Sequence, residues 1–346
     1  TTSISNVNTD KLKDVPVNSI DQALQGRATG VSIITPTGGV GEAPIVRVRG
    51  VSSITSGTQP LYIVDGMPIE TGNTSYSGNV NALADINPTD IVSMAVLKDA
   101  AAAAMYGSRA ANGVILITTR QGSKGKTRVS YDGYVGFTNA TKFFDVMNAQ
   151  QYVDFKNMAV KNRYGTDEMS LTANYTSKYG DKAFNPWTLS DGSMVDTDWS
   201  KEVLRTGVEH SHTVSLSGGS DKAQFFLSGN YDNQKGMVRG DKYSRFSLSA
   251  NGNVNATNWM RLGGSVKAST SNTAYTDGAR KGGQYATEGF TRLALILPPN
   301  VPAYNEDGTP YLGESGYIGR SPNTVFNGYT NPAALLYYGS GVKTDI

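Results

Sequence analysis

From residue 127 onward, apolar and polar side chains alternate along the chain with a period of two. In residues 127–138, for example, Val129 and Val135 fall on one face of an extended strand, and Ser130 and Asp132 fall on the other. Four more segments share this pattern: residues 211–218, 223–232, 246–254 and 260–268. Each segment is roughly ten residues long, the length of a tilted strand that crosses a bilayer. The pattern predicts an antiparallel sheet with one apolar and one polar face.

Two architectures suit such strands, a transmembrane β-barrel and a soluble β-sandwich whose apolar faces look inward. The strand pattern alone supports these two architectures almost equally. The connections favour the barrel, because tight turns alternate with longer excursions along the chain. The tight turns are residues 218–221 and 255–258, and the longer connections are residues 139–209, 233–242 and 273–337. So few strands cannot close a barrel, and an open edge is not viable in lipid. We therefore expect the chain to be the N-terminal portion of something larger.

The part of the chain before residue 122 mixes helical and extended patterns. Residues 91–97 form an apolar run, Asp99 is placed to cap a helix over Ala100–Ala104, and Val114–Ile117 are apolar on both faces. Upstream of these, the sequence predicts a short helix ended near Gly30, strands over 31–34, 45–49 and 60–64, and a hairpin turn at Asp65-Gly66.

These patterns define three parts of the chain. We expect an extended lead-in over residues 1–17, an α+β domain over residues 18–122, and the N-terminal portion of an antiparallel transmembrane β-barrel over residues 127–346. Within the first long connection, residues 148–164 carry Tyr152, Phe155 and Met158 at helical spacing, which predicts an amphipathic helix. Four aromatic residues near strand ends fit girdles at the membrane interfaces: Tyr131, Tyr231, Tyr243 and Trp259.

The composition argues against several classes of function. The net charge of +2 gives no bulk electrostatic reason to expect nucleic-acid binding. The absence of cysteine excludes disulfides and thiolate metal sites. With only two histidines, His210 and His212, a histidine-based catalytic or zinc site is poorly supplied. We therefore expect no catalytic residues, no metal and no cofactor.

Short motifs that resemble catalytic or ligand-binding signatures fail on their details. GSKGKT (residues 122–127) ends like a P-loop but has arginine where the first glycine is needed, and a strand follows it. YGSRAANG (residues 106–113) is not the G-x-S-x-G of a nucleophile elbow. The acidic stretches 191–198 and 305–309 lack the EF-hand spacing, so we interpret them as solvated loops.

Five strings, in order, resemble the plug domain of SusC/RagA-like TonB-dependent outer-membrane transporters. They are SIDQALQGRATGVSI, IVRVRGVSSI, PLYIVDGMPI, INPTDIVSMAVLKDA and MAVLKDAAAAAMYGSRAANGVILITTRQG. The resemblance implies a plug inside a barrel of the 22-stranded type, located in the outer membrane. It also implies TonB-dependent import of an oligosaccharide, or alternatively of an oligopeptide, together with a SusD-like surface lipoprotein. The alternative from a different class is a secreted β-sandwich adhesin or surface enzyme.

The resemblance also implies plug–barrel contacts through arginines. The arginines that match Arg47 and Arg49 lie between plug and wall in the family, where they meet carboxylates, and we add Arg109 to this set. The family's TonB-contacting segment precedes the plug, and residues 1–17 hold no recognisable copy of it.

Two polar loops, residues 51–59 and 71–81, are expected to face the outside and to contact substrate. Their hydroxyl and amide side chains, with one tyrosine for stacking, suit a sugar or a peptide backbone. The candidates are Ser52, Ser53, Thr55, Gln59, Asn73, Tyr76 and Asn79.

Overall fold

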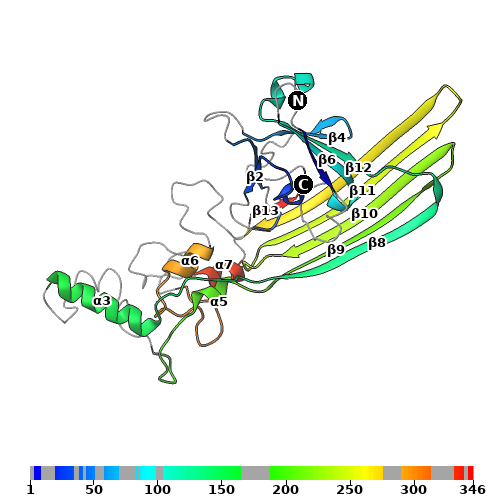
Figure 1. Cartoon of the computed structure of the whole chain (residues 1–346). Coiled ribbons are helices and arrows are strands. Elements are labelled where there is room, and N and C mark those ends of the chain that lie inside the picture. The colour runs from blue at the N-terminus through cyan, green and yellow to red at the C-terminus, as the bar shows by residue number, and fades with distance from the viewer. Residues whose placement is uncertain are drawn as a thin grey trace.

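A six-stranded antiparallel sheet of mostly long strands is the largest element of the computed structural model (Figure 1). The structure describes residues 4–8, 20–34, 39–41, 44–50, 58–69, 83, 86–98, 104–164, 188–275, 290–312, 331–338 and 342–345. The order of strands in the long-stranded sheet is β13-β12-β11-β10-β9-β8. Their bounds are β8 Gly125–Thr138, β9 Gly207–Gly219, β10 Ala223–Lys235, β11 Lys242–Asn255, β12 Arg261–Tyr275 and β13 Val342–Asp345. The five predicted strands are confirmed, and each is longer than its sequence pattern indicated.

This sheet exposes its apolar side chains and buries its polar ones, the reverse of the arrangement in a soluble protein. On the apolar face, side chains such as Val214, Phe246 and Val266 are exposed, Val266 to 68%. On the opposite face, polar side chains such as Thr213 and Asn230 are each 2% exposed. A sandwich would bury the apolar face against a core, so this arrangement contradicts the sandwich alternative and supports a barrel wall between lipid and a polar lumen.

The connections between the strands differ in part from the prediction. Residues 220–222 and 256–260 join strands at one end of the sheet, and residues 139–206, 236–241 and 276–341 leave from the other end. The alternation of short and long connections is weaker than predicted, because β10 and β11 extend toward each other and leave a turn at 236–241 that is only one residue longer than the one at 256–260. The other two connections from this end are long. Figure 1 shows the two tight hairpins at the right and the helices at the left.

A smaller five-stranded sheet, in the order β1-β6-β7-β4-β5, organises the N-terminal domain. Its strands are β1 Ile4–Asn8, β4 Leu61–Val64, β5 Met67–Ile69, β6 Ile91–Leu97 and β7 Val114–Thr119. β4 and β7 run parallel, and the other pairs are antiparallel. The remaining elements are α1 Ile20–Leu24, the hairpin of β2 Val31–Ile34 and β3 Ile45–Val48, and 3₁₀ turns at Pro88–Asp90, Ala104–Tyr106 and Ser108–Ala110.

Most predicted elements of this domain are confirmed, with two differences, and one element lies largely outside the described residues. β1 lies within the expected extended lead-in and forms an edge of the sheet by pairing with β6. β3 ends at Val48, so Arg49 follows the strand with a positive φ of 60° instead of continuing the alternation. The helix expected over Ala100–Ala104 falls largely on residues outside the described part of the chain.

The core of the N-terminal domain contains one buried polar pair. Ile20, Ala23 and Leu24 place α1 on the sheet, each with 1% exposure or less. Beside them the hydroxyl of Tyr62 on β4 donates a 2.7 Å hydrogen bond to Oδ1 of Asp21. Burial, together with the adjacent carboxylate of Asp21, raises the pKa of Tyr62 well above its ordinary value. The phenol therefore remains a donor to Asp21, and the pair fixes the position of α1 on the sheet.

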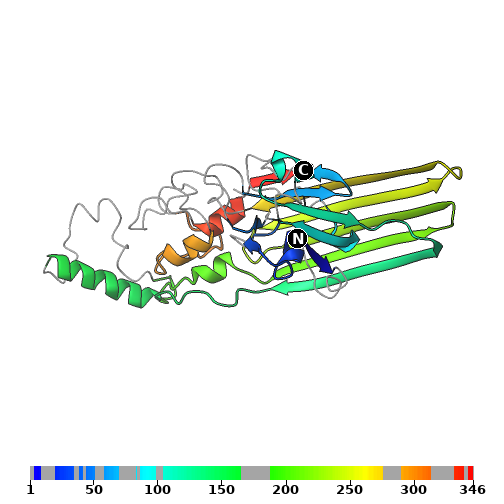
Figure 2. The same cartoon turned by 45° about the horizontal axis from the view of Figure 1, so that its top comes forward.

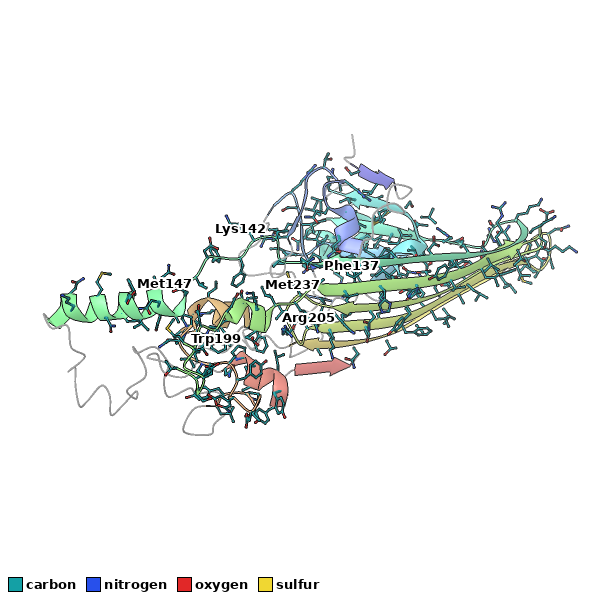
Figure 3. All side chains as sticks on the ribbon, turned by 90° about the horizontal axis from the view of Figure 1, so that it is seen from below. Phe137, Lys142, Met147, Trp199, Arg205 and Met237 are labelled. Atoms are coloured by element: carbon teal, nitrogen blue, oxygen red, sulfur yellow. The ribbon has the colours of Figure 1, made fainter. Side chains whose placement is uncertain are left out.

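A second, smaller core lies at the end of the long-stranded sheet from which the long connections leave. It is built by α5 Trp199–Val203, α6 Phe290–Ile296 and α7 Pro332–Tyr338. Arg205 joins it to the sheet, because its Nε donates to the carbonyl of Gly236 (3.0 Å) and its backbone N–H to that of Met237 (2.8 Å) (Figure 3). Among the described residues, no helix is both long and apolar enough to span a membrane.

The predicted helix in the first long connection is present as α3, Ala149–Tyr164. It extends away from the rest of the molecule (Figure 1). Phe155 and Met158 are exposed, and only Ala149 and Val153 are buried among its described side chains. The predicted helix is therefore confirmed, and among the described residues its apolar side chains Phe155 and Met158 are not covered.

We expect Tyr62→Phe to loosen α1. The variant removes one hydrogen bond from the buried Asp21, at a cost of about 1 to 3 kcal/mol, while keeping the ring in place. Amide hydrogen exchange over residues 20–24 should then become about 5- to 100-fold faster if it proceeds through local opening. Tyr106→Phe is the matched control, because among the described residues the Tyr106 hydroxyl has no hydrogen-bond partner. Equal protection of α1 in both variants would show that the pair does not hold the helix.

Candidate functional site

The N-terminal domain lies on the polar face of the long-stranded sheet (Figures 1 and 2). The side chains that join the two come from turns and strand ends of the domain and from inward-facing positions of β9 to β12. They form a polar interface with contacts at four places, described in turn below.

The strongest contact is an ion pair between Lys267 on β12 and Asp65 in the β4–β5 turn. The Lys267 Nζ lies 2.6 Å from Oδ2 of Asp65 and donates a second hydrogen bond to Oγ1 of Thr119 (3.2 Å). Asp65 also accepts from the backbone N–H of Thr119 (2.8 Å) and from its hydroxyl (2.6 Å). Three donors therefore converge on one carboxylate, and one of them belongs to the long-stranded sheet.

The parallel pairing of β4 and β7 explains why Asp65 and Thr119 meet. Parallel strands place their carboxyl ends at the same edge of a sheet, and the register pairs Val64 with Ile117. The backbone of Asp65 has a φ of 50°, in the left-handed region that few residues other than glycine, asparagine and aspartate adopt readily. The turn thus directs a carboxylate away from the domain and toward β12.

Two carboxyl groups near Lys267 have pKa values shifted in opposite directions. Partial burial would raise the pKa of Asp65, but the hydrogen bonds from Lys267 and Thr119 outweigh it and hold the pKa below the ordinary 3.8. For Asp90, at the end of the 3₁₀ turn before β6, burial dominates. It raises the pKa above 3.8 in spite of a hydrogen bond with Ser228 and the positive charge of Arg120. Because its pKa is lowered, Asp65 is ionised near neutral pH, so the interface holds opposite charges close together at Lys267 and Asp65.

A second contact fixes the segment that leads from β7 into β8. The side-chain amide of Asn251 on β11 donates to the carbonyl of Arg120 (2.8 Å) and accepts from the backbone N–H of Gly122 (3.2 Å). Gly122 passes so close to β10 that a Cβ on it would lie 2.3 Å from the backbone nitrogen of Phe225. The guanidinium carbon of Arg120 lies 6.0 Å from the ring centroid of buried Phe226, within range of a cation–π interaction.

Two further contacts lie nearer the helical end of the sheet. Asn87 donates to Oγ1 of Thr213 on β9 (3.4 Å). The ring of Tyr243 on β11 lies against Gly41, whose φ is 68° and whose Cβ, if present, would overlap the ring. Tyr243 is 4% exposed. Its expected place in an interfacial girdle is wrong, because odd-numbered residues of β11 face inward. Tyr131 and Tyr231 do lie on the exposed face.

The interface also contains a partly open cavity of about 360 Å³ between the N-terminal domain and strands β11 and β12. The domain contributes Asp65, Asn87, Asp90 and Thr119, together with apolar side chains of β4 and β5. The strands contribute Lys267 and four serines: Ser247, Ser249, Ser265 and Ser269. The hydroxyl groups can accept and donate hydrogen bonds to water or to a polar solute.

The N-terminal region matches a known family of domains. Residues 1–114 match the family model for the TonB-dependent receptor plug domain. The chain is 33% identical to the TonB-dependent receptor SusC of Bacteroides thetaiotaomicron, an alignment that covers 96% of this chain and 30% of that protein. It is 32% identical to the TonB-dependent receptor P3 of Formosa agariphila, covering 91% of this chain and 28% of that protein.

The similarity to a solved structure extends beyond the N-terminal domain. A structure of the RagAB peptide importer in its "closed-closed" state matches with a TM-score of 0.69 and 26% identity, covering 96% of this chain and 36% of that one. The chain belongs to the SusC/RagA-like TonB-dependent receptors. The receptor's N-terminal domain is a plug, and its long-stranded sheet is a section of outer-membrane barrel wall. This chain spans about a third or less of the length of these relatives.

The structure describes some of the receptor residues that the sequence singled out. Arg47 on β3 is half-buried, and its Nε has no hydrogen-bond partner among the described residues. Arg49 and Arg109 are exposed. Their role as plug–barrel contacts stays a prediction. Of the proposed substrate-binding residues, Gln59 is exposed, and its carbonyl accepts from Asn112 (3.3 Å). The others lie outside the described residues: Ser52, Ser53, Thr55, Asn73, Tyr76 and Asn79.

Sequence reasoning missed the receptor's principal plug–barrel contacts. From the sequence, Asp65 is predicted only as a turn residue, and Lys267 and Asn251 belong only to polar strand faces. The available signal is a lysine among the serines of residues 263–271 on β12, because a lysine in a covered lumen needs an acidic partner.

The barrel wall satisfies many of its own inward-facing polar groups. Arg245 pairs with Asp232, and both are buried. The amide of Asn230 donates to the hydroxyls of Thr213 (2.9 Å) and Ser211 (3.2 Å). Across the described ranges, no group of three or more acidic or histidine side chains is arranged to hold a metal ion.

Acidification should release the Lys267–Asp65 contact. A carboxyl group with a lowered pKa in the folded state contributes stability that is present above its unfolded pKa, near 3.8, and lost as the pH falls through the folded-state pKa. We expect Asp65→Asn to cost about 1 to 3 kcal/mol of local stability at pH 7. This difference from the parent should decrease as the pH falls below 3.8 and vanish below the folded-state pKa of Asp65. Hydrogen exchange of β4 and β7 measures the effect if parent and variant are compared at each pH.

The control for this prediction is Asp145→Asn, which removes the same charge at an exposed position. It should leave the exchange of β4 and β7 unchanged at every pH. A difference between Asp65→Asn and parent that persists unchanged down to pH 2 would contradict the assignment of the stabilising charge to Asp65.

Proposed function

We propose that the complete protein imports an oligosaccharide across the outer membrane by TonB-dependent active transport, with a SusD-like surface lipoprotein as partner. The observation that carries the proposal is the polar interface itself. A folded domain covers the lumen face of a wall whose other face is bare and apolar, and it is held there by hydrogen bonds and an ion pair. Such a domain blocks the lumen of the barrel but can still be displaced from the wall.

The chemistry of the interface suits a plug that has to move. When polar groups separate into water, each exchanges a protein partner for a water molecule, so the net cost per hydrogen bond is about 0.5 to 1.5 kcal/mol. An apolar interface costs about 25 cal/mol for each Å² exposed, and exposed apolar plug surface would favour aggregation or misfolding. The contacts of Lys267, Asn251 and Asn87 are of the first kind.

Force from TonB would reach the plug through its N-terminal end. The first described element there is β1, an edge strand that pairs only with β6 among the described strands. It is secured further by Lys98, whose Nζ donates to the hydroxyls of Ser5 (2.7 Å) and Thr29 (2.9 Å). We propose that β1 separates from β6 first. An edge strand has partners on one side, so its removal breaks fewer hydrogen bonds than that of any interior strand.

The substrate is proposed to contact the two polar loops of the plug, residues 51–59 and 71–81. Their hydroxyl and amide side chains suit a sugar, and the serines of the cavity beside β11 and β12 offer similar chemistry further along the interface. An oligopeptide is the second candidate, because the structurally similar RagAB is named as a peptide importer. We also propose that the plug ends near residue 122, where Asn251 fixes the chain, and that the barrel begins by residue 127.

The assignment of sides can be tested by cysteine labelling of intact cells. Single cysteines at Lys235 and Asn305 should react with a membrane-impermeant thiol reagent, because they lie at the end of the sheet from which the long connections leave. Cysteines at Ser220 and Ala256, in the tight hairpins, should stay unlabelled until the cells are opened. Since the parent chain has no cysteine, background from this region is absent. The reverse pattern would invert the topology and reject the proposed direction of import.

The substrate class can be tested on the plug loops. We expect Tyr76→Ala combined with Asn79→Ala to weaken oligosaccharide binding to the complete protein by about tenfold or more, since each lost polar or stacking contact costs about 1 kcal/mol. Calorimetric titrations with oligosaccharide and oligopeptide pools would separate the two classes. Ser123→Ala combined with Asn258→Ala is a control, because both residues lie far along the chain from these loops. Unchanged affinity with normal amounts of folded protein would remove the loops from the binding site.

A further inference from the structure

The outward-facing surface of the barrel wall changes from apolar to polar near the end from which the long connections leave, the end that we propose to be extracellular. The strand register aligns outward-facing residues into rows that cross β9, β10, β11 and β12. Two neighbouring rows in the middle of the wall contain only apolar residues and glycine: Val214, Gly229, Leu248 and Ala268, then Leu216, Leu227, Ala250 and Val266. The next row toward the outside is aromatic and mixed: His212, Tyr231, Phe246 and Thr270.

Beyond the aromatic row, the same face becomes polar and then positively charged. One row consists of His210, Asn233, Ser244 and Asn272. The following row places Lys235 of β10 directly opposite Lys242 of β11. Both lysines are exposed. Within the described part of the chain, neither lysine forms an ion pair. Both histidines of the sequence thus lie at this boundary, where the composition alone gave them no role.

The aromatic and histidine side chains at the boundary form one connected platform. The hydroxyl of Tyr131 on β8 is 2.7 Å from Nδ1 of His212. The ring centroids of His210 and His212 are 5.3 Å apart, and those of His210 and Tyr231 are 5.9 Å apart. The amide of Asn233 donates to the Tyr231 hydroxyl at 3.4 Å. Amphipathic rings of this kind favour the depth at which lipid headgroups meet acyl chains.

The lysine pair points to the occupant. Like charges directly opposite each other on neighbouring strands are destabilising, and an anion bound between them would reverse the sign of the interaction. We propose that this surface binds the phosphomonoester headgroup of a lipid in the outer leaflet. Lys235 and Lys242 contact the phosphate, the row from His210 to Asn272 offers further polar groups, and the acyl chains lie along Phe246, Leu248 and Val214.

A lipid fits better than a free anion because the site is continuous with the apolar belt. A phosphate ion would use only the two outermost rows, whereas a phospholipid uses the charged, polar, aromatic and apolar rows in the order in which they occur. Lysines close to a membrane surface strengthen the binding of anionic lipid by about fivefold each. The proposal is independent of what the receptor imports, since the platform faces away from the plug.

Native mass spectrometry of the complete detergent-solubilised protein tests the proposal. Phosphatidic acid, which carries a phosphomonoester, should bind more tightly than phosphatidylcholine with the same acyl chains. Lys235→Gln combined with Lys242→Gln should weaken phosphatidic acid binding by about 25-fold and leave phosphatidylcholine binding unchanged. Lys126→Gln combined with Lys222→Gln removes the same charge near the opposite end of the strands and should have no effect.

Inorganic phosphate distinguishes the two sources of the anion. Added at millimolar concentration, it should not displace phosphatidic acid. Displacement by phosphate alone would show an anion site without a lipid component and would overturn the proposal. Equal binding of phosphatidic acid to the parent and to the Lys235/Lys242 variant would overturn it as well, provided that the variant assembles with the parent's amount of folded barrel.

Discussion

A bilayer allows a strand to satisfy its backbone only through neighbouring strands, and it allows polar side chains only on the face turned away from lipid. The long-stranded sheet follows from this constraint. Its bare face is apolar, and its covered face carries serine, threonine, asparagine and a buried arginine–aspartate pair. An apolar domain surface could not cover a polar face of this extent without leaving hydrogen-bond donors and acceptors unpaired. The plug accordingly presents turns and strand ends to the wall, and these carry the hydrogen-bonding groups.

Lys267 shows how this works at one point. It lies among inward-facing serines of β12, and its acceptors, Asp65 and Thr119, lie at the ends of two parallel plug strands that finish side by side. Burial and pairing act against each other on the two nearby carboxyl groups, and pairing wins at Asp65 while burial wins at Asp90. The interface between plug and wall therefore relies on strong local electrostatic interactions and little on apolar contacts. This suits a plug that must bind the wall tightly and yet reversibly.

The parts of this structure that the sequence predicted are those with a local period. Alternation identified the five long strands and the direction of nearly every side chain on them, and the Asp65-Gly66 turn and the strand over 91–97 were confirmed. Contacts between the plug and the wall carry no such signal, because their members are far apart in sequence, 202 residues in the case of Asp65 and Lys267. The inward direction of Tyr243 follows from its odd-numbered position in β11, although an aromatic residue near a strand end suggested an interfacial girdle. The spacing of apolar residues predicted α3 correctly but could not say whether anything packs against it.

The close approach of Gly122 to β10 has a mechanical consequence. Asn251 is hydrogen-bonded to Gly122 and to Arg120, and Gly122 has no room for a side chain, so this segment would serve as a pivot if the plug turned. A pull that starts at β1 would therefore unravel the domain from one side while β7 stays tethered beside the wall. The loosened strands would remain at a high effective concentration relative to their native partners. Refolding of the plug after each transport cycle would then be intramolecular, because β7 would have stayed in place for the other strands to pair with.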